Sequence, residues 1–287
     1  MGSPSISVVT RTFGRPDALA RAAEGLRMQT AVFDWVVVND GEDPIDAGSL
    51  SGVGIAQTVI DEAEHLGRAR AAKMGLDAAT GDYLMLHDDD DALVPQALER
   101  LSHYLDAHSD DIAVTCGYEK VLEEGGRQTL LKRHAPELLP TLYDMAERNR
   151  ILTIGTLFRA STYREVGGMN MRVDALEDWD LWLRLMTKGD IGVIPDILAR
   201  QFVRPDTQTG DAANSHRREH EIARVRLLNT WLRADIEAGR TGLGELAHRP
   251  HARFIEESRD RLRRAGALKR KIMPWTRKSG SSNTETE

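Results

Sequence analysis

Short runs of β-branched residues alternate with helical patterns through the first third of the chain. The runs are Ile6 to Thr10 (ISVVT) and Trp35 to Asp40 (WVVVND), and DALARAAEGLRMQ between them has apolar residues at helical spacing after Pro16. Then come GIAQTVI, HLGRARAAKMGLDAAT and YLMLH, which read as strand, helix and strand. This alternation predicts an α/β fold with an open parallel sheet flanked by helices. Its ligand should lie at the carboxyl ends of the strands, where crossover loops and helix N-termini meet.

The later elements are predicted from separate local patterns. IAVTCGYEKVLEEGGRQTLLK predicts a β-hairpin that turns at Gly125 and Gly126, and ILTIGTLFRA predicts a strand. DALEDWDLWLRLMTKG and EHEIARVRLLNTWLRADIEAG predict two amphipathic helices. We expect LLNTWLRADI in the second helix to pack on the core or on a second subunit, which would make a homodimer. RHAPELLPTLYDMAERNR is a candidate lid on the acceptor side.

Composition limits the class of protein. The 287 residues are 41% hydrophobic, which is enough for one large domain or two small ones. A formal charge of -7 argues against nucleic acid as a partner, because phosphate neutralisation needs a basic face. Cys116 is the single cysteine and is expected to be a buried small hydrophobe. With neither a long apolar run nor a signal peptide, we expect a soluble, cytoplasmic protein.

Four aspartates, Asp88 to Asp91, follow the apolar run YLMLH. Adjacent carboxylates repel one another unless a cation or a set of hydrogen-bond donors offsets their charge. Side chains at a strand end alternate sides, so Asp88 and Asp90 can point into one crevice. Carboxylate oxygens suit Mg²⁺ or Mn²⁺, and such a cation would neutralise a leaving diphosphate. The alternative is a solvated acidic loop, which has no reason to follow a buried strand so abruptly.

A second acidic residue, Asp40, also ends a strand, in the sequence Asn39-Asp40-Gly41. This sequence is equally typical of a simple turn, because Asn and Asp tolerate unusual backbone angles and Gly permits a positive φ. Two acidic strand ends in one sheet nevertheless favour a shared ligand.

The sequence EDWD opens a predicted helix with three carboxylates, Glu177, Asp178 and Asp180. Their attraction to the helix N-terminus is a sufficient structural explanation for some of them. Near a metal and phosphate site, however, Asp178 could act as a general base toward a hydroxyl. Trp179 and Trp182 could stack on a sugar ring, with packing in the core as the favoured alternative.

The order of these motifs resembles glycosyltransferase family 2, whose members have the GT-A fold. The matching stretches extend from Ile6 to about Asn214 and are ISVVTRTFGRPDAL, MQT, VVVNDG, GLDAATGDYLMLHDDDD, GTLFRASTYREVGGMN and EDWDLWLRL. The resemblance implies a Rossmann-like, mostly parallel sheet and an inverting transfer of a hexosyl group in polysaccharide biosynthesis. The donor would be a UDP-, dTDP- or GDP-sugar. The acceptor would be a hydroxyl of a saccharide, a lipid-linked glycan or a glycoprotein glycan.

The resemblance also implies a role for individual residues. Asp178 would deprotonate the acceptor, Glu177 would orient it, and Asp90 would bind Mn²⁺ or Mg²⁺. Asp88 would bind the ribose or donor sugar, and Asp91 the sugar or a supporting basic residue. The residues at motif positions implied for donor binding are Arg11, Thr12, Phe13, Asp40, Asp88, Asp89 and Asp91.

Two departures from the family pattern leave donor contacts open. Members usually carry Ala-Arg-Asn where this chain has Ala71-Ala72-Lys73, so Arg70 or Lys73 is the candidate replacement for the donor-binding arginine. Many members also have a histidine after the late strand, where FVRPDTQTG offers Arg204. His216 is nearby in the sequence and could reach the site, with a surface position at a helix start as the favoured alternative.

We expect three parts of the chain: a transferase domain over residues 1–214, which the resemblance covers, a helical extension beyond it over 215–278, and a low-complexity, disordered tail over 279–287. The basic stretch from Arg253 to Lys278 could lie on an anionic membrane, with a solvated basic helix as the favoured alternative. Two other functions remain open. A nucleotidyltransferase would need a Gly-rich basic loop, of which RTFGRPD is a poor version, and a non-catalytic sugar- or nucleotide-binding relative would not need EDW.

Overall fold

The computed structural model describes residues 5–41, 43–62, 64–136, 138–173, 175–204 and 217–247. Its helices and strands in chain order are β1 (Ile6–Thr12), α1 (Pro16–Arg27), β2 (Asp34–Asn39), the 3-10 helix η1 (Ala47–Leu50), β3 (Ala56–Asp61), α2 (Arg68–Ala78), β4 (Tyr83–Asp88), β5 (Ala92–Leu93), α3 (Ala97–Ala107), β6 (Ala113–Glu124), β7 (Arg127–His134), α4 (Leu142–Glu147), β8 (Thr156–Arg159), α5 (Ala160–Glu165), α6 (Glu177–Leu185), β9 (Ile191–Val203) and α7 (Arg217–Glu237).

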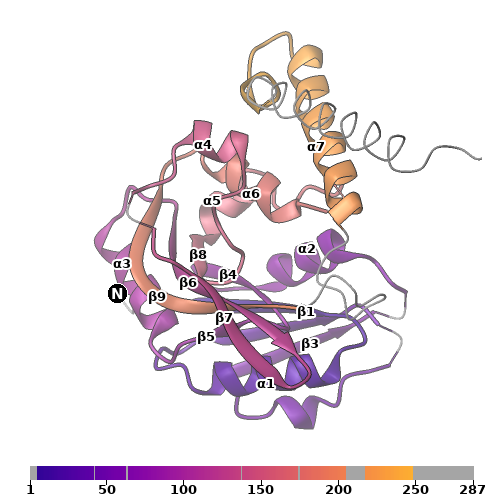
Figure 1. Ribbon diagram of the computed structural model, residues 1–287, viewed down its shortest axis with the longest axis vertical. Coiled ribbons are helices and arrows are strands. Elements are labelled where there is room, and N and C mark those ends of the chain that lie inside the picture. Colours follow the sequence, from indigo (N-terminus) through magenta and orange to yellow (C-terminus); the bar gives the residue numbers. More distant parts are fainter. Residues whose placement is uncertain are drawn as a thin grey trace, which may run out of the picture.

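One mixed sheet organises these elements (Figure 1), in the order β3-β2-β1-β4-β8-β6-β9-β5, with β7 paired to β6. The strands β1 to β4 pair in parallel, as predicted. In the second half of the sheet the strand directions are mixed. Strand β8 runs antiparallel to both β4 and β6, whereas β6 and β9 are parallel. The predicted hairpin is β6 and β7. The α/β fold class is therefore confirmed, with a sheet that is parallel only in part.

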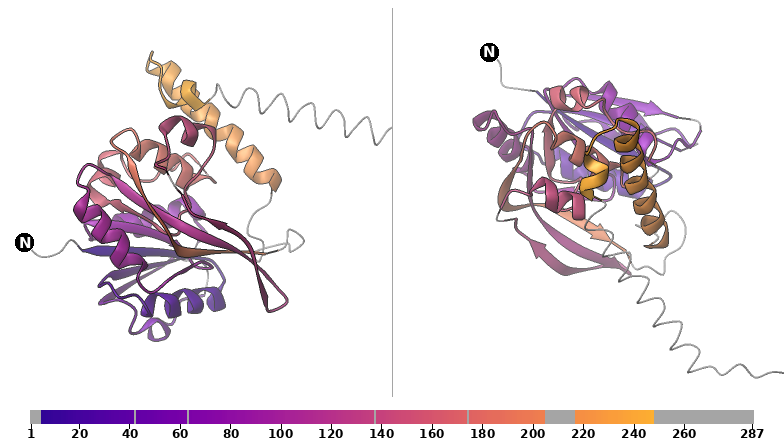
Figure 2. Two further views of the ribbon diagram at one scale, coloured as in Figure 1. Left: turned by 60° about the vertical axis from the view of Figure 1, so that its left-hand side comes forward. Right: turned by 90° about the horizontal axis from the view of Figure 1, so that it is seen from above.

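The sheet is covered on both faces, which explains the β-branched runs. Val8 and Trp35 belong to a buried cluster shared with α1 and α3, whereas the neighbouring residues Val9 and Val36 belong to a cluster shared with α2, α6 and α7. Successive side chains of a strand point to opposite faces, so each strand contributes to both clusters. Figure 2 shows α1 and α7 on opposite sides of the sheet. Around the central strands β1, β2 and β4 both faces therefore exclude water nearly to the strand ends, whereas β3 and β7 are largely exposed.

Two predicted elements are shorter than their sequence patterns. The strand predicted over ILTIGTLFRA is limited to β8, because Gly155 has a φ of 78° and interrupts the extended backbone directly before it. The helix predicted over DALEDWDLWLRLMTKG begins at Glu177, because Leu176 has a φ of 63° and cannot be part of a right-handed helix. Cys116 is buried as predicted, and burial raises the pKa of its thiol to about 12.

The helix α2 lies so close to the sheet that it has no room for a side chain at Gly75. A Cβ there would lie 2.3 Å from Cγ1 of Val9 and 2.9 Å from Cγ2 of Val38. Replacing Gly75 by Ala should therefore lower the free energy of unfolding by about 1–3 kcal/mol, through overpacking. Urea denaturation measures this loss.

Gly25 provides the matched control, because it lies inside α1 and a Cβ added there would meet no heavy atom within 4 Å. Gly25→Ala should leave stability unchanged or raise it by up to about 1 kcal/mol, since Ala is the better helix former. Equal denaturation midpoints for the two variants would contradict the close approach of α2.

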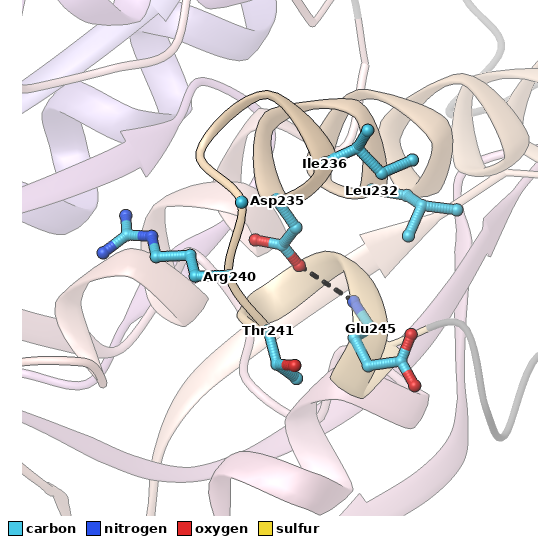
Figure 3. A pocket seen from close by; sticks show the side chains of 7 residues that line it. Leu232, Asp235, Ile236, Arg240, Thr241 and Glu245 are labelled. Carbon is cyan, nitrogen blue, oxygen red and sulfur yellow. Dashed lines mark hydrogen bonds between the residues drawn. The ribbon is translucent and has the colours of Figure 1, made fainter.

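The helix α7 packs on the body of the protein. Its Leu227, Leu228 and Trp231 join the cluster that contains α6, so the predicted packing on the core is confirmed. After α7, the carboxylate of Asp235 accepts hydrogen bonds from the backbone N–H groups of Gly242 (3.1 Å) and Glu245 (3.0 Å), which turn the chain back beside the helix (Figure 3).

Several predictions concern residues outside the described ranges. They are the domain boundary after residue 214, His216, the basic stretch from Arg253 to Lys278 and the tail over 279–287. Among the described residues, no helix is long and apolar enough to cross a membrane.

Candidate active site

The strand register brings the first and fourth strands together at the acidic end. Arg11 of β1 lies directly beside Asp88 of β4 in a parallel pair. Arg11 and Asp88 therefore point to the face covered by α2 and α6, while Thr12 and Asp89 point to the opposite face. Two separate groups of charges form in this way, one on each face of the sheet.

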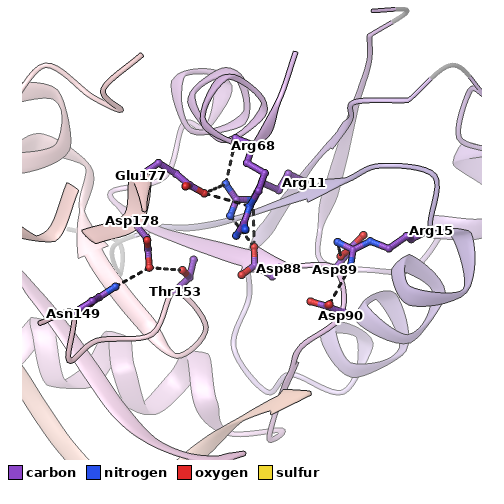
Figure 4. A network of polar contacts seen from close by, with 10 residues as sticks. All are labelled: Arg11, Arg15, Arg68, Asp88, Asp89, Asp90, Asn149, Thr153, Glu177 and Asp178. Carbon is purple, nitrogen blue, oxygen red and sulfur yellow. Dashed lines mark hydrogen bonds and ion pairs between the residues drawn. The ribbon is translucent and has the colours of Figure 1, made fainter. Parts of the chain in front are cut away.

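Arg11 is the centre of the first group (Figure 4). Its guanidinium contacts Glu177 Oε1 at 2.5 Å and Asp88 Oδ1 at 3.1 Å, and it donates to the backbone carbonyl of Arg68 at 2.9 Å. Burial alone would lower the pKa of Arg11, but the two carboxylates raise it above its ordinary value. Burial likewise opposes ionisation of Asp88 and Glu177, yet the arginines hold the pKa of both below normal. All three groups are therefore charged.

Glu177 is only 1% exposed and pairs with Arg11 rather than facing open space. This placement gives no support to the predicted orientation of an acceptor by Glu177. Its contacts instead attach the start of α6 to β1, so that the next residue, Asp178, is carried to the strand ends.

Arg68, at the start of α2, approaches the same group, with Nε 3.6 Å from Glu177 Oε1. From the sequence, Arg70 or Lys73 was proposed as the basic residue at this place, and Arg68 was not singled out. Arg70 is exposed, and Lys73 pairs with Asp77 one turn later. The Arg68 side chain is 52% exposed, but Arg68 opens α2 beside the strand ends, where its carbonyl accepts from Arg11 and its Nε approaches Glu177. It precedes the buried Ala72 by four residues, and that spacing is the sequence signal that could have identified it.

The second group contains Asp89 and Asp90. Thr12 donates to Asp89 Oδ2 at 2.6 Å, and Arg15 contacts Asp89 Oδ1 at 2.6 Å. Asp89 is fully buried, and that burial raises its pKa to about 6 despite the arginine. Asp90 Oδ2 accepts from Arg15 and from Arg204, each at 3.0 Å. The repulsion within the acidic run is thus reduced by arginines from the β1–α1 loop and from the end of β9.

Asp91 has a structural role that the sequence did not reveal. Its carboxyl accepts a hydrogen bond from the backbone N–H of Phe202 at 3.0 Å and so attaches the acidic loop to β9. Burial raises its pKa well above the ordinary value. The predicted contact of Asp91 with a sugar or a supporting basic residue stays a prediction.

Asp40 lies at the end of the neighbouring strand β2 and organises the loop before α2. Its carboxylate accepts from the N–H groups of Leu66 (2.5 Å) and Gly67 (2.9 Å), and His65 Nδ1 lies 3.0 Å away. The ring of His65 also packs against Phe13, with centroids 4.2 Å apart. Asp40 therefore helps to place the start of α2, and its contact with a nucleoside stays a prediction, as does that of Phe13.

Asp178 stands apart from the arginine pairs. Its Oδ2 atom accepts from Asn149 Nδ2 at 3.0 Å and from Thr153 Oγ1 at 3.4 Å. Burial, followed by the negative charge of Glu177, raises the pKa of Asp178 to about 6. A carboxylate with this pKa is ionised at neutral pH yet is a stronger base than an ordinary aspartate.

The two tryptophans of α6 pack in the core. Trp179 and Trp182 are 2% and 0% exposed, and Trp179 Nε1 donates to the backbone carbonyl of Met145 at 2.6 Å. The packing alternative is confirmed, and stacking on a sugar ring is excluded by this burial.

A continuous series of contacts joins the acidic residues at one edge of the sheet. Asp178 follows Glu177, which pairs with Arg11, and Arg11 pairs with Asp88, two residues before Asp90. Figure 4 shows Asp178 and Asp90 on either side of Asp88. Asp178 and Asp90 therefore lie at the same edge of the sheet, one beside each of the two charge groups.

The fit to a divalent cation rests on Asp90. Among the described residues, no three His, Cys, Asp or Glu side chains are placed to hold a metal ion. Mg²⁺ and similar cations, however, commonly bind through one or two carboxylates together with substrate phosphates and water. The hydrogen bonds from Arg15 and Arg204 both end on Oδ2 of Asp90. A single carboxylate of this kind fits a partial cation site, in which substrate phosphates and water would supply the remaining ligands.

The half-sheet of parallel strands thus carries acidic residues at its strand ends, a buried arginine paired with two carboxylates and, apart from them, the carboxyl of Asp178. Residues 7–179 match the model of glycosyl transferase family 2, and the chain belongs to that family. It is therefore a glycosyltransferase, as the order of its motifs predicted.

Relatives and solved structures agree with this membership. The chain is 25% identical to the uncharacterized glycosyltransferase YwdF of Bacillus subtilis, over 91% of this chain and 92% of that protein. S. aureus TarS 1–349 in complex with UDP-GlcNAc has a TM-score of 0.59 at 18% identity, over 78% of this chain and 67% of that one. In a longer TarS structure the chain covers only 37% of the length.

A third similar protein is the mannosyltransferase PcManGT from Pyrobaculum calidifontis, in complex with GDP-Man and Mn²⁺. Its TM-score is 0.56 at 16% identity, over 93% of this chain and 81% of that one. At these identities the solved structures show that the GT-A fold is shared.

Proposed function

We propose that the protein is a metal-dependent, inverting glycosyltransferase that moves a hexosyl group from a nucleoside diphosphate to an acceptor hydroxyl. The observation that carries this proposal is the carboxyl of Asp178, which accepts hydrogen bonds from Asn149 and Thr153 beside the acidic end of β4 and whose pKa is raised to about 6 by burial and by Glu177, although Arg68 and Arg11 lower it. A general base needs a pKa close to the working pH and a position near the proton it removes.

In the proposed reaction Asp178 takes the proton of the acceptor hydroxyl while the hydroxyl oxygen attacks the anomeric carbon of the donor. A new carbon–oxygen bond forms as the bond to the diphosphate breaks, and its electron pair leaves with the diphosphate. Attack from the face opposite the leaving group inverts the anomeric configuration in one displacement. Asn149 and Thr153 orient the carboxylate by their hydrogen bonds to Oδ2.

The donor side of the proposal centres on Asp90. A divalent cation bound there would neutralise charge on the leaving diphosphate. Arg15 and Arg204, which contact Asp90, add positive charge at the same place. Two solved neighbours support this assignment, since one is in complex with UDP-GlcNAc and the other with GDP-Man and Mn²⁺. UDP-, dTDP- and GDP-sugars are therefore the candidate donors, with Arg11, Thr12, Asp40 and Asp88 as proposed contacts.

The remaining parts of the proposal concern acceptor and location. We propose a saccharide, lipid-linked or glycoprotein glycan as acceptor and a cytoplasmic location. Peripheral contact of the basic stretch from Arg253 to Lys278 with an anionic membrane belongs to the same proposal.

Thermal shift against a panel of UDP-, dTDP- and GDP-sugars with Mn²⁺ tests the donor assignment, because a ligand that binds only the folded state raises its stability, by about 2.7 kcal/mol at 100 times its Kd. Asp90→Ala should abolish the part of the shift that depends on Mn²⁺. The control is Asp110→Ala, at an exposed loop position outside the site. A full Mn²⁺-dependent shift in Asp90→Ala would contradict the metal assignment.

The released product distinguishes the three functions considered. An inverting transferase slowly releases nucleoside diphosphate from its donor in the presence of metal. A nucleotidyltransferase instead releases pyrophosphate, and a non-catalytic binding protein releases neither.

A further inference from the structure

The helix α7 contacts the first turn of α6, which carries Asp178. Trp231 is 6% exposed, and its Nε1 donates to Asp180 Oδ1 at 2.7 Å. Its ring meets Trp179 edge to face, with centroids 5.7 Å apart and planes at 81°. One α7 side chain therefore touches both residues that follow Asp178.

A second α7 residue, Arg224, contacts the end of α4, next to the loop that carries Asn149. The guanidinium of Arg224 lies 5.7 Å from the centre of the Trp179 ring, and its Nη2 donates to the carbonyl of Glu147 at 3.1 Å. Glu147 ends α4, and Asn149, two residues later, donates to the Asp178 carboxylate. The same helix thus contacts the turn that carries Asp178 and the loop that orients it.

The start of α6 depends on such external contacts. Leu176, directly before the helix, has a φ of 63° and makes no side-chain cap. A leucine in this region is strained and persists only where its surroundings determine the backbone. Asp180 supplies one such restraint, because Arg184 Nε (2.7 Å) and Asn170 Nδ2 (3.2 Å) hold its carboxylate together with Trp231.

We propose that Trp231 is a positioning residue for the transfer reaction, acting through Asp180 and Trp179 to orient the carboxylate of Asp178. This inference rests on the proposed role of Asp178 as general base. The family match ends at residue 179, so α7 contributes this function from outside the matched region. Without the indole N–H, the first turn of α6 loses one of the donors to Asp180 and admits water near Asp178.

Trp231→Phe tests the proposal, since it keeps an aromatic ring and removes only the N–H and part of the volume. In carboxyl-¹³C NMR, the Asp178 signal, assigned by its loss in Asp178→Asn, should titrate with a pKa about one unit lower, because hydration favours the ionised form. The charged groups facing Asp178 in this titration are Glu177, Arg11 and Arg68. This measurement needs no substrate.

Kinetics provide the second readout, with UDP-GlcNAc and GDP-mannose each tested with Mn²⁺. Where either is consumed, Trp231→Phe should lower kcat at least about tenfold, as expected for a misplaced catalytic group, with the donor KM within about twofold of the wild-type value. In the Asp178→Asn background the same change should have no further effect on kcat. Such non-additivity is expected only if Trp231 acts through Asp178.

Trp35→Phe is the matched control, because Trp35 is also buried and donates its N–H to Thr10 Oγ1 at 2.8 Å, on the face away from α6. It should change thermal stability while leaving the pKa of Asp178 and kcat unaltered. A wild-type pKa and kcat in folded Trp231→Phe would overturn the positioning role. Full transfer by Asp178→Asn would instead overturn the base itself, and the positioning role with it.

Discussion

Replacing Asp178 by Asn is expected to slow sugar transfer by about 10²–10⁴-fold, the range lost with a general acid–base group. Asn keeps the size of the side chain and can still accept from Asn149 and Thr153 through its carbonyl oxygen. It cannot take a proton from the acceptor, so the loss should appear in kcat. Initial rates of nucleoside diphosphate release in the presence of acceptor measure this effect.

Measuring donor affinity distinguishes the proposed base role of Asp178 from the proposed donor-side role of Asp90. Isothermal titration with the donor and Mn²⁺ should give nearly the wild-type Kd for Asp178→Asn, because Asp178 faces the acceptor in the proposed reaction. Asp106→Asn is a suitable control, since Asp106 accepts from Tyr83 away from the site. An equal loss of donor affinity in Asp178→Asn and Asp90→Ala would contradict the separate roles.

The same carboxyl should determine the acidic limb of the pH profile. A base acts only when it is deprotonated, so kcat should rise tenfold per pH unit below about 6 and reach a plateau above it. Asp89 also has a pKa of about 6, from its own burial. Glu177→Gln distinguishes Asp178 from Asp89 as the cause of the limb, because the negative charge of Glu177 raises the pKa of Asp178 and its removal lowers that pKa. The limb should move to lower pH if Asp178 causes it.

Replacing Arg11 by Met should lower the free energy of unfolding by about 3–5 kcal/mol, the usual cost of removing one member of a buried ion pair. The change leaves Glu177 and Asp88 in a buried site without the guanidinium that lies 2.5 Å and 3.1 Å from them. Urea denaturation of the ligand-free protein measures the effect.

Arg21→Met is the matched control for this experiment. Arg21 also pairs closely with a carboxylate, Glu123 at 2.6 Å, but its side chain is 41% exposed. Exposed pairs contribute about 0–1 kcal/mol, so this loss should be small. Glu177→Gln in the Arg11→Met background should restore part of the stability, because one buried charge is removed. Equal losses in Arg11→Met and Arg21→Met would show that burial of the Arg11 pair carries no cost.

The sequence predicted the first half of the fold because its signals are local. Buried parallel strands read as β-branched runs, and α1 and α2 place apolar residues at helical spacing, so each element could be located without its neighbours. The antiparallel β8 was not predictable in the same way, since its pairing with β4 and β6 joins segments far apart in the chain.

The site was predicted in part for the same reason. The run Asp88 to Asp91 and the residue Asp178 stand out as charges at element ends. Their partners do not, because Asn149 and Thr153 reach Asp178 only after α4 and β8 have packed. Arg68 was missed because its selection over Arg70 depends on which side of α2 meets the sheet.

The alternation of charges across β1 and β4 has a consequence for folding. A slip of one residue of β1 against β4 would send Arg11 toward α1 and Thr12 toward α6, which separates the guanidinium from Glu177 and deprives Asp89 of the Thr12 hydroxyl. Misaligned chains would thus bury uncompensated charge on both faces at once. The ion pairs at the strand ends therefore favour the native register of β1 and β4 over registers shifted by one residue.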